Sequence, residues 1–202
     1  MRISKEAAEA NKGRIVKAAG RMIRERGFQG LGVAEVMKEA GLTHGGFYNH
    51  FDSKEDLGAA AIREAFDAAI ARLRTRAAEA SSEEKALKDY IARYLSETTR
   101  DNPGRSCPMA ALGTDAARYE GAMRAEFANG IERYLEAFAS MFPAGDRCKQ
   151  SILNMATLVG ALTLARACAG TNEALSQQIL KSVSEQLISE PRSSFAGLDD
   201  PS

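Results

Sequence analysis

The chain has 202 residues, of which 45% are hydrophobic, so it can bury a core in one large or two modest domains. Its formal net charge is zero, which excludes a uniformly basic protein that coats nucleic acid. Three widely spaced cysteines, Cys107, Cys148 and Cys168, argue against a disulfide framework.

The N-terminus is charged and lacks the apolar region of a signal peptide. The longest uncharged apolar stretch, residues 152–165, is too short to cross a bilayer. We therefore expect a cytoplasmic protein without a membrane partner.

Charge is distributed unevenly along the chain. Residues 1–26 hold eight Lys and Arg residues against three Asp and Glu residues, whereas the remainder holds nineteen against twenty-four. A positive end on a mildly acidic body is expected when that end faces DNA. The solvated face of an ordinary amphipathic helix gives the same pattern, so the charge alone does not decide between them.

Residues 33–57 show the pattern of a helix-turn-helix. Apolar residues recur at helical spacing in the first part, at Val33, Val36, Met37 and Ala40. A glycine-containing turn follows at residues 41–43, and a second short helix is predicted over residues 44–51, with Phe47 and Phe51 as its apolar members. Two short helices fixed at a steep angle present the second as a protruding rod, which the major groove of DNA can admit.

A more specific pattern lies in the same stretch, in Ala40, Gly41, Leu42, Thr43, Tyr48, His50, Phe51, Lys54, Glu55 and Leu57. This pattern resembles the DNA-binding signature of the TetR family of bacterial transcriptional repressors. Residues 14–30 resemble the first helix of that family, with its ending in glycine and an aromatic residue. The resemblance implies an all-α fold, in which an N-terminal three-helix helix-turn-helix domain precedes a helical domain for effector binding and dimerisation.

The sequence departs from the family pattern at two places. Gly32 stands where the family usually has Thr or Ser at the start of the scaffold helix, so a side-chain cap is missing there. Gly45 and Gly46 each weaken a helix by about 1 kcal/mol relative to alanine. We therefore expect the second helix to complete its ordering on DNA.

Residues at the exposed start of the second helix are candidates for reading DNA bases. Asn49 can pair bidentately with adenine, and glycine lets the backbone approach a base without an intervening side chain. Base reading is assigned to His44, Gly45, Gly46 and Asn49. A phosphate contact or a helix cap are the alternatives for His44.

Other residues are assigned to the phosphate backbone. Tyr48 points to a different side of the helix from the preceding phenylalanine, so its hydroxyl can donate to a phosphate, with a core position as the alternative. Lys54 follows the predicted N-cap Ser53, at a helix start that favours an anion, with a solvated charge as the alternative. By the resemblance, Thr43 contacts a phosphate and His50 is a packing or phosphate-side residue.

The remainder of the chain reads as helices. Apolar stripes at helical spacing cover residues 57–73, 87–95, 123–141, 152–162 and 175–187, with a cap at residues 81–84 and a stop at residues 102–104. Nothing alternates as a strand does. We predict a DNA-binding domain over residues 1–54, an effector-binding and dimerisation domain over residues 55–189, and a disordered tail over residues 190–202.

A signal-sensing site is expected in the middle of the chain, where large apolar residues and hydroxyls provide the lining for a pocket. The candidates for binding a small apolar or electrophilic effector are Phe66, Tyr94, Cys107, Met109, Leu112, Phe127, Tyr134 and Phe138. An ordinary core uses the same residue types, so core packing stays the alternative for these positions.

Cys107 precedes Pro108, which suits the first position of a helix. A helix N-terminus with Arg105 nearby lowers the pKa of a thiol and makes it more nucleophilic, as a redox or electrophile sensor requires. The alternative is a small buried side chain at a helix start.

The helix predicted to begin near residue 152 is apolar on more than one side, which favours contact with a second subunit, although burial inside a monomer is the alternative. The family resemblance implies that the last two helices form the dimer interface. A dimer places two recognition helices about 34 to 36 Å apart, one turn of DNA, and so reads a palindrome.

These features predict a homodimeric DNA-binding regulator, most simply a repressor that a small hydrophobic ligand or modification of Cys107 releases from its operator. The alternative is a helical small-molecule-binding protein or an enzyme without DNA-binding activity. The chain offers an enzyme little, because both histidines lie in the helix-turn-helix and neither metal-ligand spacing nor a nucleophile elbow is present. No cofactor is expected.

Overall fold

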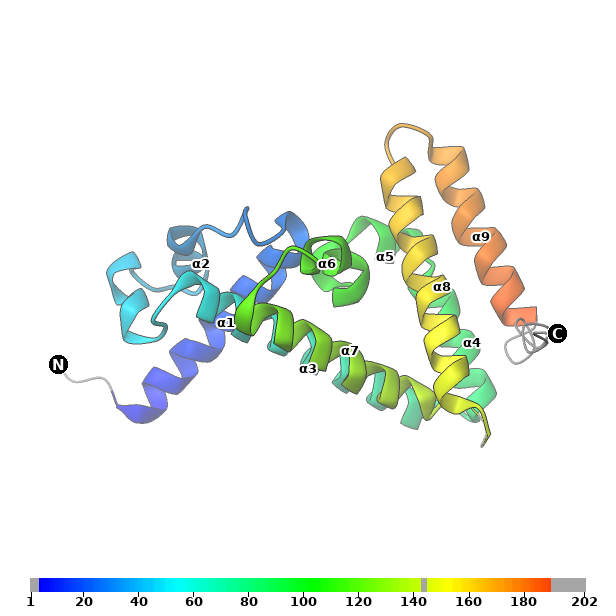
Figure 1. The fold of residues 1–202 in the computed structure, drawn as a ribbon, viewed down its shortest axis with the longest axis horizontal. Coiled ribbons are helices and arrows are strands. Elements are labelled where there is room, and N and C mark those ends of the chain that lie inside the picture. Colours follow the sequence, from blue (N-terminus) through cyan, green and yellow to red (C-terminus); the bar gives the residue numbers. More distant parts are fainter. Residues whose placement is uncertain (1–3, 143–144, 190–202) are drawn as a thin grey trace. The chain divides into compact units, whose positions relative to one another are not determined.

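The computed structural model describes residues 4–142 and 145–189, which form nine α-helices and two 3₁₀-helices without a strand (Figure 1). The predicted all-α fold is confirmed for this part of the chain. The backbone divides into two compact units, Met1–Ala69 with Pro103–Ile131 (the first unit) and Ile70–Asn102 with Glu132–Ser202 (the second unit). The functional boundary after residue 54 stays a prediction, and the predicted tail, residues 190–202, lies outside the described residues.

The first unit begins with α1 (Lys5–Arg26), α2 (Val33–Glu39) and the 3₁₀-helix η1 (His44–Asn49). Ser4 caps α1 by accepting a hydrogen bond from the backbone N–H of Ala7 at 3.1 Å. Helix α1 packs against α2, and α2 packs against η1. Their shared core consists of fully or almost fully buried apolar side chains: Ile15, Ala19, Met22, Ile23, Val36, Met37 and Phe47.

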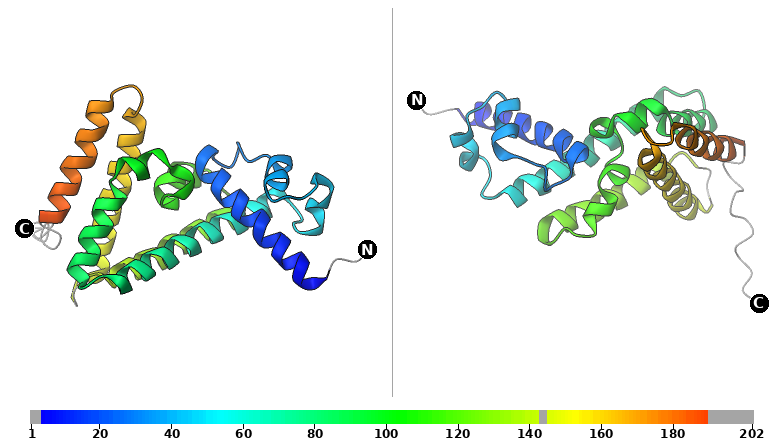
Figure 2. Two further views of the ribbon diagram at one scale, coloured as in Figure 1. Left: turned by 180° about the vertical axis from the view of Figure 1, so that it is seen from behind. Right: turned by 90° about the horizontal axis from the view of Figure 1, so that it is seen from above.

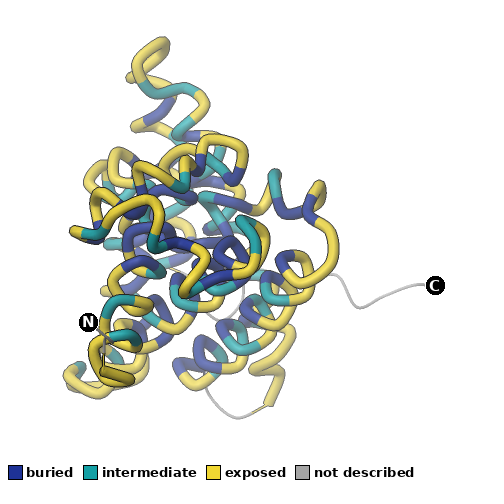
Figure 3. The backbone as a smooth tube through the Cα atoms, turned by 90° about the vertical axis from the view of Figure 1, so that its left-hand side faces the viewer, coloured by how far each residue is buried: buried dark blue, intermediate teal, exposed yellow. Residues whose placement is uncertain are grey.

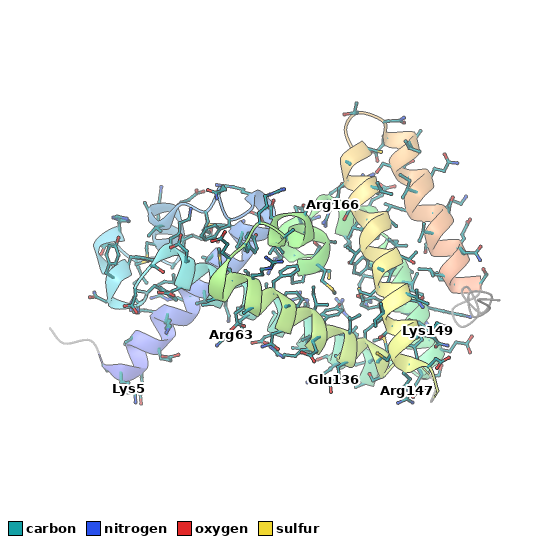
Figure 4. All side chains as sticks on the ribbon, viewed as in Figure 1. Lys5, Arg63, Glu136, Arg147, Lys149 and Arg166 are labelled. Carbon is teal, nitrogen blue, oxygen red and sulfur yellow. The ribbon has the colours of Figure 1, made fainter. Side chains whose placement is uncertain are left out.

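The first unit also contains η2 (Pro103–Arg105), α6 (Pro108–Ala116) and the first parts of α3 (Lys54–Glu79) and α7 (Gly121–Ala139). Arg24 of α1 donates two hydrogen bonds, of 2.9 and 2.6 Å, to the carbonyl oxygen of Gly104. On α3, Arg63 pairs with Glu126 of α7 (Figure 4). These contacts join segments that lie far apart in the sequence.

The second unit contains α4 (Glu83–Tyr94), α5 (Glu97–Asp101), α8 (Arg147–Cys168), α9 (Glu173–Ser189) and the remaining parts of α3 and α7. Helices α8 and α9 run side by side in opposite directions (Figures 1 and 2). Ser82 caps α4 as predicted, by accepting from the N–H of Lys85 at 3.1 Å.

Helix α5 was not predicted as a separate element. The sequence pattern favoured one helix up to residue 102, but α4 ends at Tyr94 and Ser96 caps a new helix by accepting from the N–H of Thr99. Arg100 in α5 is buried and donates to Glu173 and Ser176 of α9, at 2.6 and 2.8 Å. The pairing of Arg100 with Asp101 holds the pKa of the Asp101 carboxyl below its ordinary value.

Arg166 of α8 donates to the carbonyl oxygens of Arg100 and Thr99, at 3.0 and 2.9 Å (Figure 4). These bonds satisfy carbonyl groups at the end of α5, which have no partner inside such a short helix. Together with the Arg100 contacts, they fix α5 on α8 and α9.

Buried and exposed residues alternate along the helices (Figure 3). Helix α8 has two apolar faces, of which one is buried and the other is exposed. Leu158 and Leu162 are fully buried, whereas Ile152 is 46% and Leu164 59% exposed. Within the described residues, α8 is the one helix that is long and apolar enough to cross a bilayer, so the shortness of residues 152–165 does not by itself exclude a membrane span. Its buried face packs against α4, α5 and α9, as the face of a core helix does.

Candidate DNA-binding site

A Schellman motif makes the turn between α2 and η1. Gly41 has a φ of 72°, which glycine adopts without the penalty that a Cβ brings. The N–H of Gly41 donates to the carbonyl of Lys38 at 3.0 Å, and the N–H of Leu42 donates to that of Met37 at 2.8 Å. This pair of bonds ends α2 abruptly and sets the direction in which η1 leaves.

The second element of the predicted helix-turn-helix is a 3₁₀-helix rather than an α-helix. The N–H of Gly46 donates to the carbonyl of Thr43 at 3.0 Å, and that of His50 donates to Phe47 at 2.9 Å, both across three residues. Two adjacent glycines explain this form, because they lower the helix propensity where an α-helix would begin. Thr43, at the N-cap, makes no side-chain cap bond.

Phe47 and Phe51 form the buried base of η1. Phe47 is 2% exposed and Phe51 is 6% exposed, and their rings stack with centroids 5.8 Å apart. These two positions match the predicted core of the small domain. Because the base is anchored, the opposite side of η1 is held in a defined orientation.

The predicted DNA-contacting residues lie on the outer side of η1 or beside it. Tyr48 is 74% exposed, whereas Phe47 is buried, although the edges of their rings meet with centroids 5.2 Å apart. The remaining candidates are exposed, at Thr43, His44, Gly45 and Asn49, or half-buried, at Gly46, His50 and Lys54. Their roles in contacting DNA stay predictions.

Lys54 opens α3, and Ser53 caps this helix as predicted by accepting from the N–H of Asp56 at 3.0 Å. The Lys54 ammonium lies 4.7 Å from the centroid of the Phe28 ring, a cation–π contact. To contact a phosphate, the Lys54 ammonium must therefore either move away from the Phe28 ring or bind the phosphate while it stays next to the ring.

Lys12 of α1 is a basic residue that the sequence analysis missed. Its ammonium lies 5.4 Å from the centroid of the Phe51 ring and so beside the buried base of η1. No local pattern signals this position, because the contact joins residues 39 positions apart.

Part of the positive charge in residues 1–26 serves to hold α2. Arg21 pairs with Glu25 and Glu39, and Arg26 pairs with Glu35 at 2.8 Å. The hydrogen bonds from Arg21 to the two carboxylates raise the pKa of its guanidinium. The exposed basic residues of α1 outside these ion pairs are Lys5, Lys12, Arg14 and Lys17. The charge available to DNA is therefore smaller than the sequence count indicated.

The predicted effector-binding residues are all buried, but they fall into both compact units. Phe66, Cys107, Met109, Leu112 and Phe127 belong to the first unit, whereas Tyr94, Tyr134 and Phe138 belong to the second. The Phe66 and Phe127 rings meet edge to face at 5.4 Å. The hydroxyl of Tyr134 lies 2.9 Å from that of Tyr90, within hydrogen-bond distance.

Cys107 is the N-cap residue of α6 and Pro108 occupies the first turn, as predicted. The Cys107 side chain is buried, whereas Cys148 is exposed and Cys168 is half-buried. Burial agrees with the structural alternative for Cys107, while its place at the helix start keeps the sensor hypothesis open.

Comparison with known proteins gives the class to which this fold and this exposed element belong. The family model of bacterial regulatory proteins of the tetR family matches residues 15–61, from within α1 to the start of α3. The transcriptional regulator AcuR of Cereibacter sphaeroides is 29% identical over 136 residues, covering 66% of this chain and 62% of AcuR. The transcriptional repressor DhaR of Mycobacterium sp. is 26% identical, covering 61% of each chain.

A solved structure resembles nearly the whole chain. The crystal structure of reduced NemR from E. coli superposes with a TM-score of 0.73 at 19% identity, covering 88% of this chain and 94% of NemR. At this identity the likeness concerns the fold alone. Over residues 15–61 the chain therefore matches the tetR family of bacterial regulatory proteins, and AcuR and DhaR, which it resembles, are transcriptional regulators. It spans just over 60% of the length of AcuR and of DhaR.

Proposed function

We propose that this chain is a DNA-binding transcriptional regulator, and specifically a repressor that binds a palindromic operator as a homodimer. The observation that carries the proposal is the exposed side of η1, which consists of polar side chains and glycines. Beneath it lies a buried base of Phe47 and Phe51. A protruding element that is buried and apolar on one side and exposed and polar on the other fits the major groove of DNA. The name of the relative DhaR, a transcriptional repressor, supports the sign of the regulation.

Within this proposal, Tyr48, Thr43 and Lys54 contact phosphates, and His44 and Asn49 reach the edges of bases. Gly45 and Gly46 let the backbone approach the groove, because neither brings a side chain between the backbone and the bases. Phosphate contacts set the register of the protein on the duplex, and base contacts supply the sequence preference.

The mobility of an operator fragment tests the DNA-binding proposal. Lys54→Gln is expected to weaken binding about tenfold, since a charged hydrogen bond to a phosphate is lost. The slope of log K against log salt is expected to fall by about 1. The measurement is a titration of the DNA upstream of the coding region, at several salt concentrations.

Lys85→Gln is the matched control, because Lys85 is an exposed lysine that pairs with Asp89 on α4. This variant is expected to bind as the unaltered chain does. Equal affinities and salt slopes for the Lys54 and Lys85 variants contradict the phosphate role of Lys54, and the absence of any salt-sensitive shift contradicts DNA binding.

The homodimer is proposed to form through α8 and α9. The outer side of α8 exposes Ile152 and Leu164, with the small residues Ala156 and Gly160 between them at four-residue spacing, and α9 exposes Leu175. Residues at this spacing share one face of a helix, and small residues allow close approach. Apolar side chains of this size on one face favour a subunit contact.

Leu164→Glu is expected to convert the dimer to monomer at micromolar concentration, because a buried interface does not tolerate an unpaired carboxylate. Sedimentation equilibrium measures the change. Leu175→Glu, on α9, serves as a second variant of the same interface, and Ser189→Glu, at the exposed end of α9, as the control. A monomeric unaltered chain, or an unchanged dimer with both leucine variants, contradicts this interface.

Release from the operator is proposed to follow binding of a small apolar or electrophilic effector, or modification of Cys107. The buried aromatic and sulfur-containing residues predicted from the sequence, Phe66, Tyr94, Cys107, Met109, Leu112, Phe127, Tyr134 and Phe138, provide adaptable apolar surface for such a ligand. A ligand that prefers one arrangement of the helices shifts the population toward it, and the two recognition elements then lose the spacing of one DNA turn. The proposed site of action is the cytoplasm.

A further inference from the structure

A cleft of about 480 Å³ lies within the first unit, apart from all the residues assigned to effector binding above. It is lined by the loop after α1, by the start of α3, and by the segment that joins α6 to α7. This volume falls within the range of sites for small molecules. Phe28, Tyr119, Met123, Glu55, Asp115 and Glu120 are the lining residues on which the following argument depends.

The apolar side of the cleft is made by Phe28, Tyr119 and Met123, each at least nine-tenths buried. The Phe28 and Tyr119 rings meet edge to face, with centroids 6.2 Å apart. A Cβ at Gly58 of α3 would lie 2.5 Å from the Met123 sulfur and 2.8 Å from a ring carbon of Phe28, so both side chains press closely on this helix. The backbone of α3 therefore limits the movement of both side chains.

Tyr119 carries an unsatisfied polar group next to this apolar surface. Its hydroxyl is buried and has no hydrogen-bond partner within the described part of the chain. Buried hydroxyls are almost always paired, and an unpaired one lowers stability. Burial raises the pKa of Tyr119 to about 12, and the charge of Asp115 adds to this effect, so the phenol stays protonated and neutral. The oxygen is closed to solvent in the free chain, so a ligand in the cleft reaches it when the Tyr119 side chain turns.

The charges around the cleft decide which ligand it favours. Arg26 is already paired with Glu35, and Arg118 is paired with Asp115 at 3.2 Å. The Lys54 ammonium lies 4.7 Å from the centroid of the Phe28 ring and so brings one positive charge close to the cleft. The carboxylates of Glu55 and Glu120 have no ion-pair partner among the residues that the structure describes. When the charge of Lys54 is set against the two carboxylates, one negative charge remains in excess beside the aromatic rings, which favours an organic cation over an anion.

We propose that this cleft binds a small organic amine, whose apolar body packs on Phe28 and Met123 and whose ammonium group meets Glu120 and the hydroxyl of Tyr119. The proposal goes beyond DNA binding and its regulation, because the site is complete without DNA. Its test therefore uses the full chain alone, so that failure of the operator assay and failure of this proposal are told apart.

Calorimetric titration with 2-phenylethylamine tests the site, with phenylacetate and 2-phenylethanol as probes of the same ring and different charge. Saturable binding of the amine, at least tenfold tighter than that of the alcohol and the acid, is expected from the charge of the cleft. Equal or tighter binding of phenylacetate overturns the proposal, and so does the absence of saturable amine binding.

Two variants assign the binding to this cleft. Glu120→Gln and Tyr119→Phe are each expected to weaken amine binding about tenfold, as loss of a charge-assisted hydrogen bond does. Glu79→Gln, an exposed carboxylate at the end of α3, is the matched control and is expected to bind as the unaltered chain does. Unchanged affinity in both cleft variants overturns the assignment.

Thermal unfolding of the free chains separates a ligand-binding hydroxyl from a structural one. Tyr119→Phe removes an unpaired buried hydroxyl, so its Tm is expected to stay equal or rise by about 2 °C while amine affinity falls. A lower Tm reveals a structural partner for the hydroxyl and contradicts the proposal.

Discussion

Replacing Phe47 with alanine is expected to lower the free energy of unfolding by about 3 to 5 kcal/mol, whereas the same change at Tyr48 alters it by less than about 0.5 kcal/mol. The two residues are neighbours in η1, but Phe47 is 2% exposed and Tyr48 is 74% exposed. Phe47 stacks on Phe51 and carries the contact of η1 with the core, so its truncation leaves a cavity.

The variants separate packing from DNA contact. Tyr48→Ala is expected to weaken operator binding about tenfold with a nearly unchanged unfolding curve, because it loses a contact to phosphate and, within the chain, only the edge contact of an exposed ring with Phe47. Phe47→Ala is expected to lose both stability and binding. Urea unfolding and operator titration measure the two effects. Full operator affinity in Tyr48→Ala contradicts the assigned contact, and an unchanged unfolding midpoint in Phe47→Ala contradicts the packing of η1.

Adding one methyl group at Gly130 is expected to destabilise the chain by about 2 to 3 kcal/mol. Gly130 lies on α7, and a Cβ there would overlap with the ring of Phe66 on α3. Phe66 is fully buried and meets Phe127 edge to face, so the ring has little room to move. The strain outweighs the gain of about 1 kcal/mol that alanine brings to a helix interior.

Gly13→Ala is the matched control for this prediction. Gly13 also lies inside a helix, but a Cβ there meets nothing within 4 Å. This variant is expected to gain about 0.5 to 1 kcal/mol from helix propensity alone. Thermal unfolding of both variants measures the difference. Stabilisation by both substitutions shows that α3 and α7 are less closely packed than the structure indicates.

Features that depend on neighbours in the sequence were predictable. The caps at Ser53 and Ser82, proline at the start of α6, and the opposite burial of Phe47 and Tyr48 follow from side chains within one helical turn. The 3₁₀ form of η1 also has a local cause in its two adjacent glycines, although the sequence predicted only a short helix there.

Features that depend on distant partners were not predictable from periodicity. The start of α5 does have a local signal, because Ser96 is a suitable N-cap and is followed by an acidic residue. The burial of Arg100 has none, because it depends on hydrogen bonds to Glu173 and Ser176 of α9. The same holds for the ion pairs between α1 and α2 and for the unpaired hydroxyl of Tyr119. One sequence gives the composition of such clusters but not their assembly.

Position 45 lies on the outer side of η1 and carries glycine, and a Cβ built there meets no other atom within 4 Å. The backbone does not need glycine at this point, since the φ angles that favour this residue occur elsewhere, at Gly41 among others. A side chain can therefore be added at this position without its Cβ disturbing the scaffold beneath it. A library randomised at this one codon offers a direct route to proteins of the same fold with altered target sequences.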